Sequence, residues 1–328
     1  MKLYLQISLG YFAFAVLFAV AMGQTFDSTL TQFIENAIRQ LNFARFFILV
    51  LLAVFAFVYW KFGVERFLAQ LRQFAIAFVA TLFSLTAFAM VKSNLAGLAA
   101  LWAPPPFFAD PFFAELDFAL HFGNDPYVWL HQMLGAFGNA WVDISYGAVW
   151  TVLSSGMILI VAMTDRDQNR IKDMVFLWTF VQIFLGNVLA LAGMSAGPVY
   201  YDRLFDTERF VPLAPALVNA GLNEGFIGSV QAGLWHAYDA QAQSLGTGIS
   251  AFPSIHVAVA MTALVYFASR SLLWLPLGIL YVAIIQIQSV LTGYHYALDG
   301  YFSILAVGTL WWWLRRRRNN LSNARLSD

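Results

Sequence analysis

Apolar windows of about 18 to 20 residues recur along the chain, and they restrict its fold more than any other feature. A helix of that length crosses the hydrocarbon core of a bilayer, because every backbone polar group is bonded within the helix. Hydrophobic residues make up 60% of the 328 residues and charged residues only 11%, which a water-soluble core does not need. The sequence therefore predicts an integral membrane protein of the all-α class, a polytopic helix bundle.

Eight such windows give the expected spans, and the first of them has a second interpretation. Lys2, the apolar stretch after it and the small residues Ala19–Ala21 also suit a signal peptide that is cleaved. We favour a retained helix, because this aromatic apolar stretch resembles the other spans. The expected spans are Leu5–Met22, Phe43–Trp60, Leu71–Val91, Tyr146–Met163, Met174–Met194, Ile255–Phe267, Trp274–Leu291 and Tyr296–Leu314.

The charged residues divide between the two sides that these spans imply. Most of the 18 Lys and Arg residues lie on the side of the N-terminus and the C-terminal tail, whereas most of the 18 Asp and Glu residues lie on the other side. Positive residues of short loops stay in the cytoplasm, so the acidic side is expected to be extracytoplasmic. The run Arg315–Arg318 then anchors a cytoplasmic C-terminus at the inner leaflet. We expect a multi-pass protein of a bacterial inner membrane, with a periplasmic site.

Two long connections, residues 92–145 and 195–254, fall on the acidic side. The first contains LWAPPPFFADPFFAELDFALHFG, whose prolines, aromatic residues and few acids suit interfacial helices in the headgroup zone. Such helices suit either a lid over the bundle or an entry surface for lipid, and the sequence does not separate these roles. Four regions are expected: transmembrane helices in residues 1–92, an interfacial segment in 93–145, a helix core with the candidate site in 146–314, and a basic cytoplasmic tail in 315–328.

Topology brings two histidines to the same membrane depth. The sixth and seventh spans form a hairpin with a cytoplasmic turn, so His256 at its start and His295 just after its end both lie on the outer side. Asp299 follows His295 by four residues, hence on the same face of the eighth helix. A carboxylate there can hold the imidazole in one tautomer and steady its positive form. Without such a partner, a carboxylate within a span is costly.

The segment before His256, GTGISAFPS, is suited to bind an anion. Its glycines, Gly248 among them, allow an irregular backbone, and Pro253 suits the first position of a helix. Free N–H groups near Ser254 and His256 then point outward, and such a helix start binds phosphate. An imidazole beside a phosphate is suited to donate or accept a proton. We therefore expect Ser254 and Gly248 to bind substrate.

The alternative for His256 and His295 is a purely structural role in interhelical hydrogen bonds. Their ordered combination with Asp299 favours chemistry instead. No cluster has the spacing of a metal site, and the chain has no cysteine, so we expect no metal. Structural or interfacial roles are expected for the other histidines: His121, which follows Asp117 by four residues, His131 and His236.

Two short motifs resemble those of a known enzyme superfamily. FPSIH at residues 252–256 and GYHYALD at residues 293–299 resemble the second and third signatures, P-S-G-H and S-R-x5-H-x3-D, of the type-2 phosphatidic acid phosphatase superfamily. Ile255 in place of glycine, and a third motif without arginine, are closer to the inositol phosphorylceramide synthase and aureobasidin-resistance branch. SAGPVYYDRLF at residues 195–205 resembles a proline-containing segment of that branch.

The resemblance implies a six-helix phosphatase-type core and a role for each motif residue. His295 is expected to be the nucleophile that accepts the phosphoryl group as a phosphohistidine, and Asp299 to orient it. His256 is expected to protonate the departing alcohol oxygen and then to activate water or a second alcohol. Ser254 is expected to donate a hydrogen bond to a phosphate oxygen. The scheme needs no metal and no other cofactor.

The chain departs from the superfamily in its cations. The first motif, K-x6-R-P, is absent, and Ser289 stands where the third motif has arginine. Phosphoryl transfer depends on countering negative charge, so a replacement is expected. Arg203 is the candidate, because a guanidinium grips two phosphate oxygens at once, and Tyr201 and Tyr200 are candidate helpers. The alternative for Arg203 is a salt bridge with a neighbouring acid.

Three functions follow from these residues. The first is a lipid phosphatase, in which water accepts the phosphoryl group. The second is a transferase that moves a phospho-headgroup between lipids, and the motif variant favours it. The third is a non-catalytic transporter, which predicts charges in other spans and inverted repeats, and neither feature is seen. The expected partners are a membrane lipid phosphate and the bilayer, with no nucleic acid, and the sequence predicts no oligomeric state.

Overall fold

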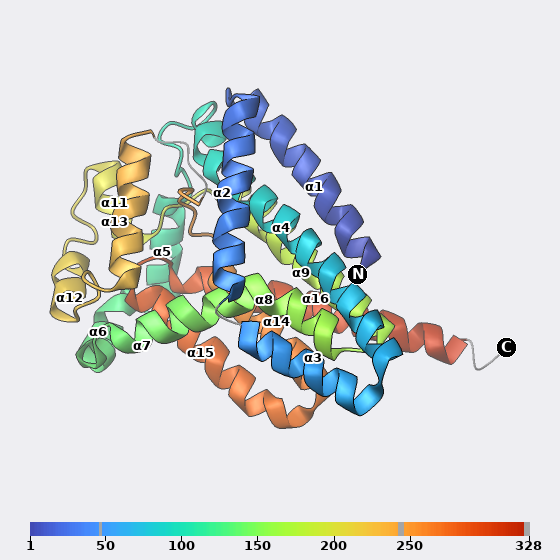
Figure 1. Cartoon of the computed structure of the whole chain (residues 1–328). Coiled ribbons are helices and arrows are strands. Elements are labelled where there is room, and N and C mark those ends of the chain that lie inside the picture. The colour runs from blue at the N-terminus through green and yellow to red at the C-terminus, as the bar shows by residue number, and fades with distance from the viewer. Residues whose placement is uncertain (46–47, 242–245, 325–328) are drawn as a thin grey trace. The chain divides into compact units, whose positions relative to one another are not determined.

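Helices form all of the regular secondary structure in the residues that the computed structural model describes, 1–45, 48–241 and 246–324 (Figure 1). The expected all-α class is therefore confirmed. The chain divides into two compact units: the described parts of residues 1–94, 155–176 and 243–246, and those of residues 95–154, 177–242 and 247–328. All of the candidate site residues belong to the second unit.

Three helices and most of a fourth begin the first unit: α1 (Lys2–Ala21), α2 (Phe26–Arg45), α3 (Ile48–Phe62) and α4 (Val64–Ala100). Gly23, at φ +88°, allows the tight turn between α1 and α2. The Phe12 ring of α1 lies 5.2 Å from the Phe33 ring of α2 and 5.1 Å from the Phe83 ring of α4, between centroids. These edge and tilted contacts are the arrangements that aromatic rings prefer, and they join the three helices in one core.

The second unit is built around three helices that pack together, α14 (Ile255–Arg270), α15 (Leu275–Leu291) and α16 (Ala297–Ala324). Small side chains such as Ala258 of α14 are fully buried, and they let the helices approach closely. Further helices of this unit are α5 (Asp110–Leu120), α6 (Pro126–Leu134), α7 (Ala140–Val142), α10 (Ala190–Ala192), α11 (Pro198–Phe205), α12 (Leu213–Asn219) and α13 (Phe226–Asp239).

Two helices, α8 (Trp150–Thr164) and α9 (Gln168–Thr179), contribute residues to both units, and each is joined to a π-helical segment. The segment Asp143–Val149 leads into α8, and Phe180–Leu189 connects α9 to α10. Such wide turns shift the faces of a helix and are frequent at functional sites. The first of them carries Tyr146, which lies in the candidate site described below.

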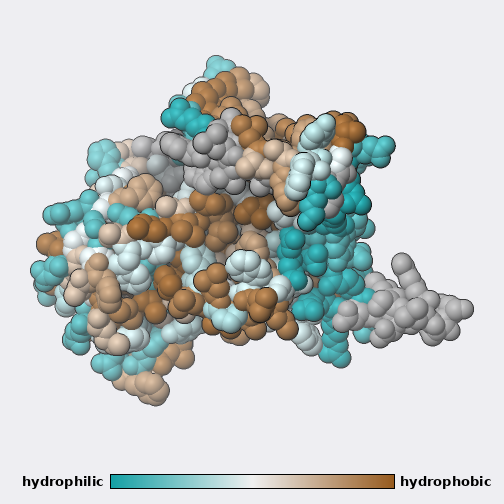
Figure 2. Space-filling view, turned by 60° about the horizontal axis from the view of Figure 1, so that its bottom comes forward, coloured by the Kyte–Doolittle hydropathy of each residue, from teal (hydrophilic) through white to brown (hydrophobic). Residues whose placement is uncertain are grey.

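Five helical stretches are long and apolar enough to cross a membrane by length and composition: Lys2–Ala21, Val64–Ala100, Ala140–Thr164, Gln168–Ala192 and Leu272–Leu291. They overlap the first, third, fourth, fifth and seventh expected spans. Large apolar side chains of α15, such as Leu277 and Leu280, are exposed, and Figure 2 shows apolar residues over much of one face. This is the surface that a lipid environment requires, and the chain is an integral membrane protein.

The other three expected spans are not among these five. The sixth lies in α14, an apolar helix of 16 residues, and the eighth lies in α16. The second, residues 43–60, includes residues 46 and 47, which lie outside the described residues. The number of eight spans therefore stays a prediction, as do the interfacial positions of α5 and α6 in the first long connection, whereas α7 belongs to the apolar stretch Ala140–Thr164.

Candidate active site

His295 and Asp299 lie side by side at the start of α16. His295 Nδ1 is 3.3 Å from Asp299 Oδ2, and both side chains are buried. The amide N–H of Tyr296 donates to the same carboxylate oxygen at 3.1 Å. An ionised carboxylate only accepts hydrogen bonds, so with Asp299 ionised the proton of a neutral His295 imidazole would lie on Nδ1 and the lone pair on Nε2. Asp299 is thus placed to orient the His295 ring.

His256 lies between two aromatic rings. It stacks on Tyr146 with 4.1 Å between centroids and on Trp150 with 4.0 Å, at interplanar angles of 7° and 28°. Trp150 Nε1 also donates to the backbone carbonyl of His256 at 3.2 Å. The His256 ring is 5.9 Å from the His295 ring, between centroids, and inclined to it by 66°. The two aromatic rings therefore hold His256 beside His295.

Ser254, rather than Pro253, prepares the start of α14. The helix begins at Ile255, and Ser254 Oγ caps it by accepting from the Val257 amide at 3.4 Å, so the expected place of Pro253 inside the first turn is wrong. A serine oxygen can satisfy a free amide of the first turn, which proline cannot do. Ser254 is fully buried, and its own amide donates to the Asp299 carbonyl at 3.3 Å. It therefore ties the start of α14 to α16.

Asp110, at the start of α5, connects the site to the segment of residues 195–197. Its carboxylate accepts from the amides of Ala196 at 2.6 Å and Gly197 at 3.0 Å, and from the Tyr296 hydroxyl at 2.8 Å. The side chain is fully buried, and this burial raises the pKa of Asp110 to about 7, although the three donors oppose the shift. Tyr296 follows His295 directly, so Asp110 holds the backbone that carries His295.

Asp117 lies two helical turns further along α5, on the same face as Asp110. Its carboxylate accepts from the amides of Ala297 at 3.2 Å and Leu298 at 3.0 Å, and so satisfies free N–H groups in the first turn of α16. Burial raises the pKa of Asp117, and these two amides oppose the shift. Together the two aspartates bond to backbone or hydroxyl groups of residues 296–298, between His295 and Asp299.

Gly197 is required where the segment of residues 195–197 meets the chain before His295. It has φ +89°, and a Cβ built on it would collide with the carbonyl oxygen of Tyr294. The Val199 amide donates to the Gly293 carbonyl at 2.9 Å, which holds the two segments together. Only glycine combines this backbone conformation with so close an approach.

The structure brings together four of the predicted site residues, Ser254, His256, His295 and Asp299, and the recorded contact of Arg203 is with Trp235. The Arg203 side chain is exposed, and its guanidinium lies 5.3 Å from the centroid of the Trp235 ring. Within the described residues Arg203 makes no salt bridge, so the expected alternative is not seen either.

The two other predicted substrate-binding residues also have neighbours outside the histidine pair. Tyr201 packs against Phe205 and Phe210, at 4.8 and 5.2 Å between ring centroids. Gly248 lies in the coil that leads to α14. The roles of Arg203, Tyr201 and Gly248 stay predictions.

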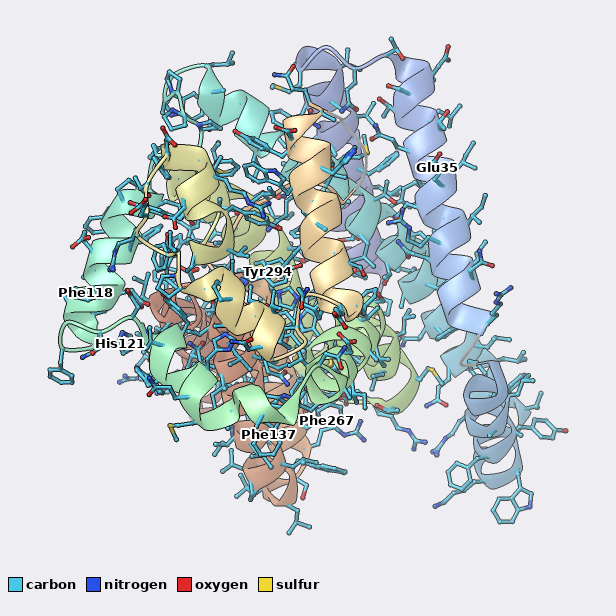
Figure 3. The ribbon with its side chains drawn as sticks, turned by 90° about the vertical axis from the view of Figure 1, so that its left-hand side faces the viewer. Glu35, Phe118, His121, Phe137, Phe267 and Tyr294 are labelled. Carbon is cyan, nitrogen blue, oxygen red and sulfur yellow. The ribbon has the colours of Figure 1, made fainter. Side chains whose placement is uncertain are left out.

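The remaining histidines with recorded contacts bond to groups outside the pair. His121 contacts the Asp117 carbonyl through Nδ1 at 2.7 Å and the Tyr301 hydroxyl through Nε2 at 3.1 Å. Figure 3 shows His121 near the end of α5 and Tyr294, the neighbour of His295, further inside the molecule. His131 Nε2 lies 2.8 Å from the Leu291 carbonyl. Within the described part of the chain, no group of three or more His, Cys, Asp or Glu side chains is placed to hold a metal.

Four residues of the site were not predicted from the sequence. Tyr146 and Trp150 are four residues apart at the start of the fourth expected span, and this spacing places both on one helix face. Asp110 and Asp117 are seven residues apart in an apolar, aromatic segment, and this spacing indicates one buried face. The signals were present, but the partners of these residues lie between 86 and 186 residues away in the chain.

The arrangement suits chemistry on a group that is bound between two imidazoles, one of which attacks it while the other transfers a proton. A near-attack distance of about 3 to 3.5 Å for a nucleophile and a hydrogen-bond reach of about 2.6 to 3.2 Å for an acid can be met by rings at this separation. His295 offers Nε2 as a nucleophile because Asp299 holds Nδ1. His256 offers a ring nitrogen for proton transfer on the other side of a bound group.

Comparison of the sequence with known proteins identifies a family for the chain. Residues 113–313 match a family model described as the PAP2 superfamily, and this range is more than half of the 328 residues. It contains Ser254, His256, His295 and Asp299, whereas Asp110 lies just before it. No curated protein and no solved structure matches the chain. On the strength of the matched range, the chain belongs to the PAP2 superfamily, whose motifs it resembles.

Proposed function

We propose that this protein is a membrane enzyme that transfers a phosphoryl group from a lipid phosphate ester through a phosphohistidine on His295. Membership of the PAP2 superfamily supports phosphatase-type chemistry on a lipid phosphate. The observation that carries the proposal is the buried contact of 3.3 Å between His295 Nδ1 and Asp299 Oδ2, with the His256 ring 5.9 Å away. Few structural roles require a second imidazole beside a histidine that a carboxylate already orients.

In the first half of the proposed reaction, His295 Nε2 attacks the phosphorus atom. The N–P bond forms as the bond from phosphorus to the lipid oxygen breaks, and His256 gives its proton to that oxygen. Asp299 stabilises the positive charge that develops on His295. In the second half, His256 takes a proton from the acceptor, whose oxygen attacks phosphorus as the N–P bond breaks.

The negative charge of the phosphate needs partners, and protonated His256 is the first of them. The imidazole lies about 4 Å from two aromatic faces, and such faces attract a cation. Ser289, in the place of the missing arginine, donates its hydroxyl proton to the Ile285 carbonyl at 2.8 Å, and its Oγ lies 3.4 Å from the Tyr146 hydroxyl, so this position supplies no charge. Arg203 remains the proposed second cation, with Ser254, Tyr201 and Gly248 as proposed phosphate contacts.

The acceptor is either water or the hydroxyl of a second lipid. Ile255 in the second motif and Ser289 in the third resemble the inositol phosphorylceramide synthase branch, and this favours an alcohol acceptor. The transferred group is then a phospho-headgroup, and the same two histidines perform both steps. Water remains the alternative, and the same site would then make a lipid phosphatase.

The charge distribution of the sequence supports a site on the extracytoplasmic side of a bacterial inner membrane. The basic tail after residue 314 and the basic short loops mark the cytoplasmic side. The substrate would then reach the site from the outer leaflet.

One assay tests the proposed function. Purified protein in detergent is given lipids labelled in the phosphate, with and without a lipid alcohol, and His295→Ala serves as the inactive control. Free labelled phosphate indicates a hydrolase, and a new labelled lipid that needs the alcohol indicates a transferase. If the wild type releases no label from any phosphate or phosphodiester lipid tested, the proposal is wrong.

A further inference from the structure

Three basic side chains of the first unit line one cavity. The cavity has a volume of about 470 Å³ and lies between α1, α4 and α9, which are neighbours in Figure 1. Lys2 comes from α1, Arg72 from α4 and Lys172 from α9. The other lining residues are polar or apolar and include no acid: Met1, Leu3, Ala69, Gln73, Ile76, Gln168, Ile171 and Val175.

Among the described residues, Lys2, Arg72 and Lys172 make no ion pair, although the neighbouring Arg170 bonds to Asp165 through its guanidinium at 2.8 Å. Three like charges around a small cavity repel one another, and a bound anion would offset this repulsion. The positive-inside tendency explains the sign of the charges, but it does not explain why they meet at one cavity without partners.

The position of the cavity along the helices suits a headgroup. Lys2 lies just before the first expected span, Arg72 at the start of the third, and Lys172 just before the fifth. The cations therefore stand where three spans enter the bilayer on the same expected side. Apolar residues such as Ile76 and Ile171 line the same cavity, so the cavity offers a charged part and an apolar part together. Basic pockets between transmembrane helices bind anionic headgroups in this way.

We propose that Lys2, Arg72 and Lys172 bind the phosphate headgroup of an anionic phospholipid of the bilayer. The lipid is a ligand here and not a substrate, since the two histidines are no part of this cavity. The inference does not rest on the proposed function, because binding is measured without turnover.

Native mass spectrometry of the purified full chain, titrated with phosphatidylglycerol, tests the inference. The cavity variant Lys2→Gln/Arg72→Gln/Lys172→Gln is expected to bind this lipid about 100-fold more weakly, from about 1 kcal/mol for each basic residue. The control Arg315→Gln/Arg316→Gln/Arg317→Gln removes the same charge from the tail and should keep the tight adduct. Lys172→Gln alone, a single change at an exposed side chain, is expected to weaken binding about fivefold.

Three results would overturn the inference. Equal binding of phosphatidylcholine, which has no net charge, would show that the negative charge of the headgroup does not contribute to binding. Competition by inorganic phosphate at the same concentration as the lipid would indicate a site for a free anion. Equal weakening in the tail variant, or unchanged binding in both the cavity variant and Lys172→Gln, would show that Lys2, Arg72 and Lys172 form no specific lipid site.

Discussion

At the scale of single residues, the least usual environment is that of His256 between Tyr146 and Trp150. If His256 protonates the leaving oxygen, His256→Ala should lower kcat by about 10²- to 10⁴-fold on an alkyl ester. A nitrophenyl leaving group needs no proton, so its ester should lose much less activity in the same variant. Turnover of the two esters by wild type and variant checks this, and His236→Ala, a change at an exposed histidine, is the control. The same loss on both esters would rule out the acid role.

The substitution Arg203→Lys distinguishes a role in phosphate binding from a role in stacking on Trp235. Its guanidinium lies over the Trp235 ring at 5.3 Å, and a lysine keeps the charge but neither stacks as a plane nor grips two oxygens. If Arg203 binds phosphate, Arg203→Lys should lower kcat/KM by about tenfold or more, with little change in the unfolding midpoint. A normal kcat/KM with a lowered midpoint would leave Arg203 a structural role only. Steady-state kinetics and thermal unfolding of one preparation supply both readouts.

At the scale of elements, α5 supports the start of α16 through two buried carboxylates. The pKa of Asp110 is about 7 in the folded protein and about 3.9 in an unfolded chain. Between these values the folded state binds the proton more tightly. The stability that Asp110 contributes is therefore full below about pH 4 and is lost as the pH rises through about 7.

Asp110→Asn is neutral at every pH and should remove this contribution. The unfolding midpoint of the wild type should fall more steeply between about pH 4 and about pH 7 than that of the variant. Glu115→Gln, a change at an exposed carboxylate of the same helix, should keep the wild-type slope. Thermal unfolding in detergent at several pH values measures these slopes. Identical slopes in Asp110→Asn and the wild type would mean that Asp110 is ionised over the whole range.

The contact between the segments of residues 195–199 and 293–295 gives a second prediction at this scale. Gly197→Ala combines a positive φ with a collision at the Tyr294 carbonyl, so it should destabilise the protein by about 3 kcal/mol or more and lower kcat. Gly221→Ala has a similar φ of +66° but open space around its Cβ, so about 1 kcal/mol is expected. Equal unfolding midpoints for the two variants would show that the close approach of Gly197 to the Tyr294 carbonyl does not affect stability.

The hairpin of α14 and α15 shows how much of the site the sequence could predict. The two apolar runs and the short turn between them were enough to place His256 near His295, because antiparallel neighbours return the chain to the same depth. The contact between Asp299 and His295 was predicted, but not its geometry, because α16 begins at Ala297 and His295 lies before the helix. The predicted span begins at Ile255, as α14 does, but Pro253 lies before the cap residue Ser254 and not at the first position of the helix.

The contacts by which Asp110 and Asp117 hold the site could not be predicted in the same way. Asp110 bonds to residues 86, 87 and 186 positions away, and no local pattern specifies such partners. Asp117 was taken as part of an interfacial segment, since its amide partners in α16 become visible only in the fold. Spacing thus predicted contacts within one helix or one hairpin, and tertiary packing decided the rest.

At the scale of the whole molecule, three of the four aspartates that are buried among the described residues lie at the candidate site. The described helices confirm an integral membrane protein of the PAP2 superfamily, and Asp110, Asp117 and Asp299 all bond to residues at or beside the start of α16. A buried charge in such a protein is costly unless it is bonded, so these acids indicate a position that the fold must keep rigid. The account therefore depends on what His295 does there.

Trapping the covalent intermediate tests that claim most directly. The protein is quenched in denaturant at alkaline pH during turnover of a lipid labelled in the phosphate, and the label on the chain is located by mass spectrometry. A histidine-bound phosphoryl group is labile to acid, so an acid-treated sample is the chemical control. The account predicts acid-labile label on His295 in the wild type and in His236→Ala, and none in His295→Ala. Turnover of the lipid by His295→Ala, or label on any other residue, would contradict it.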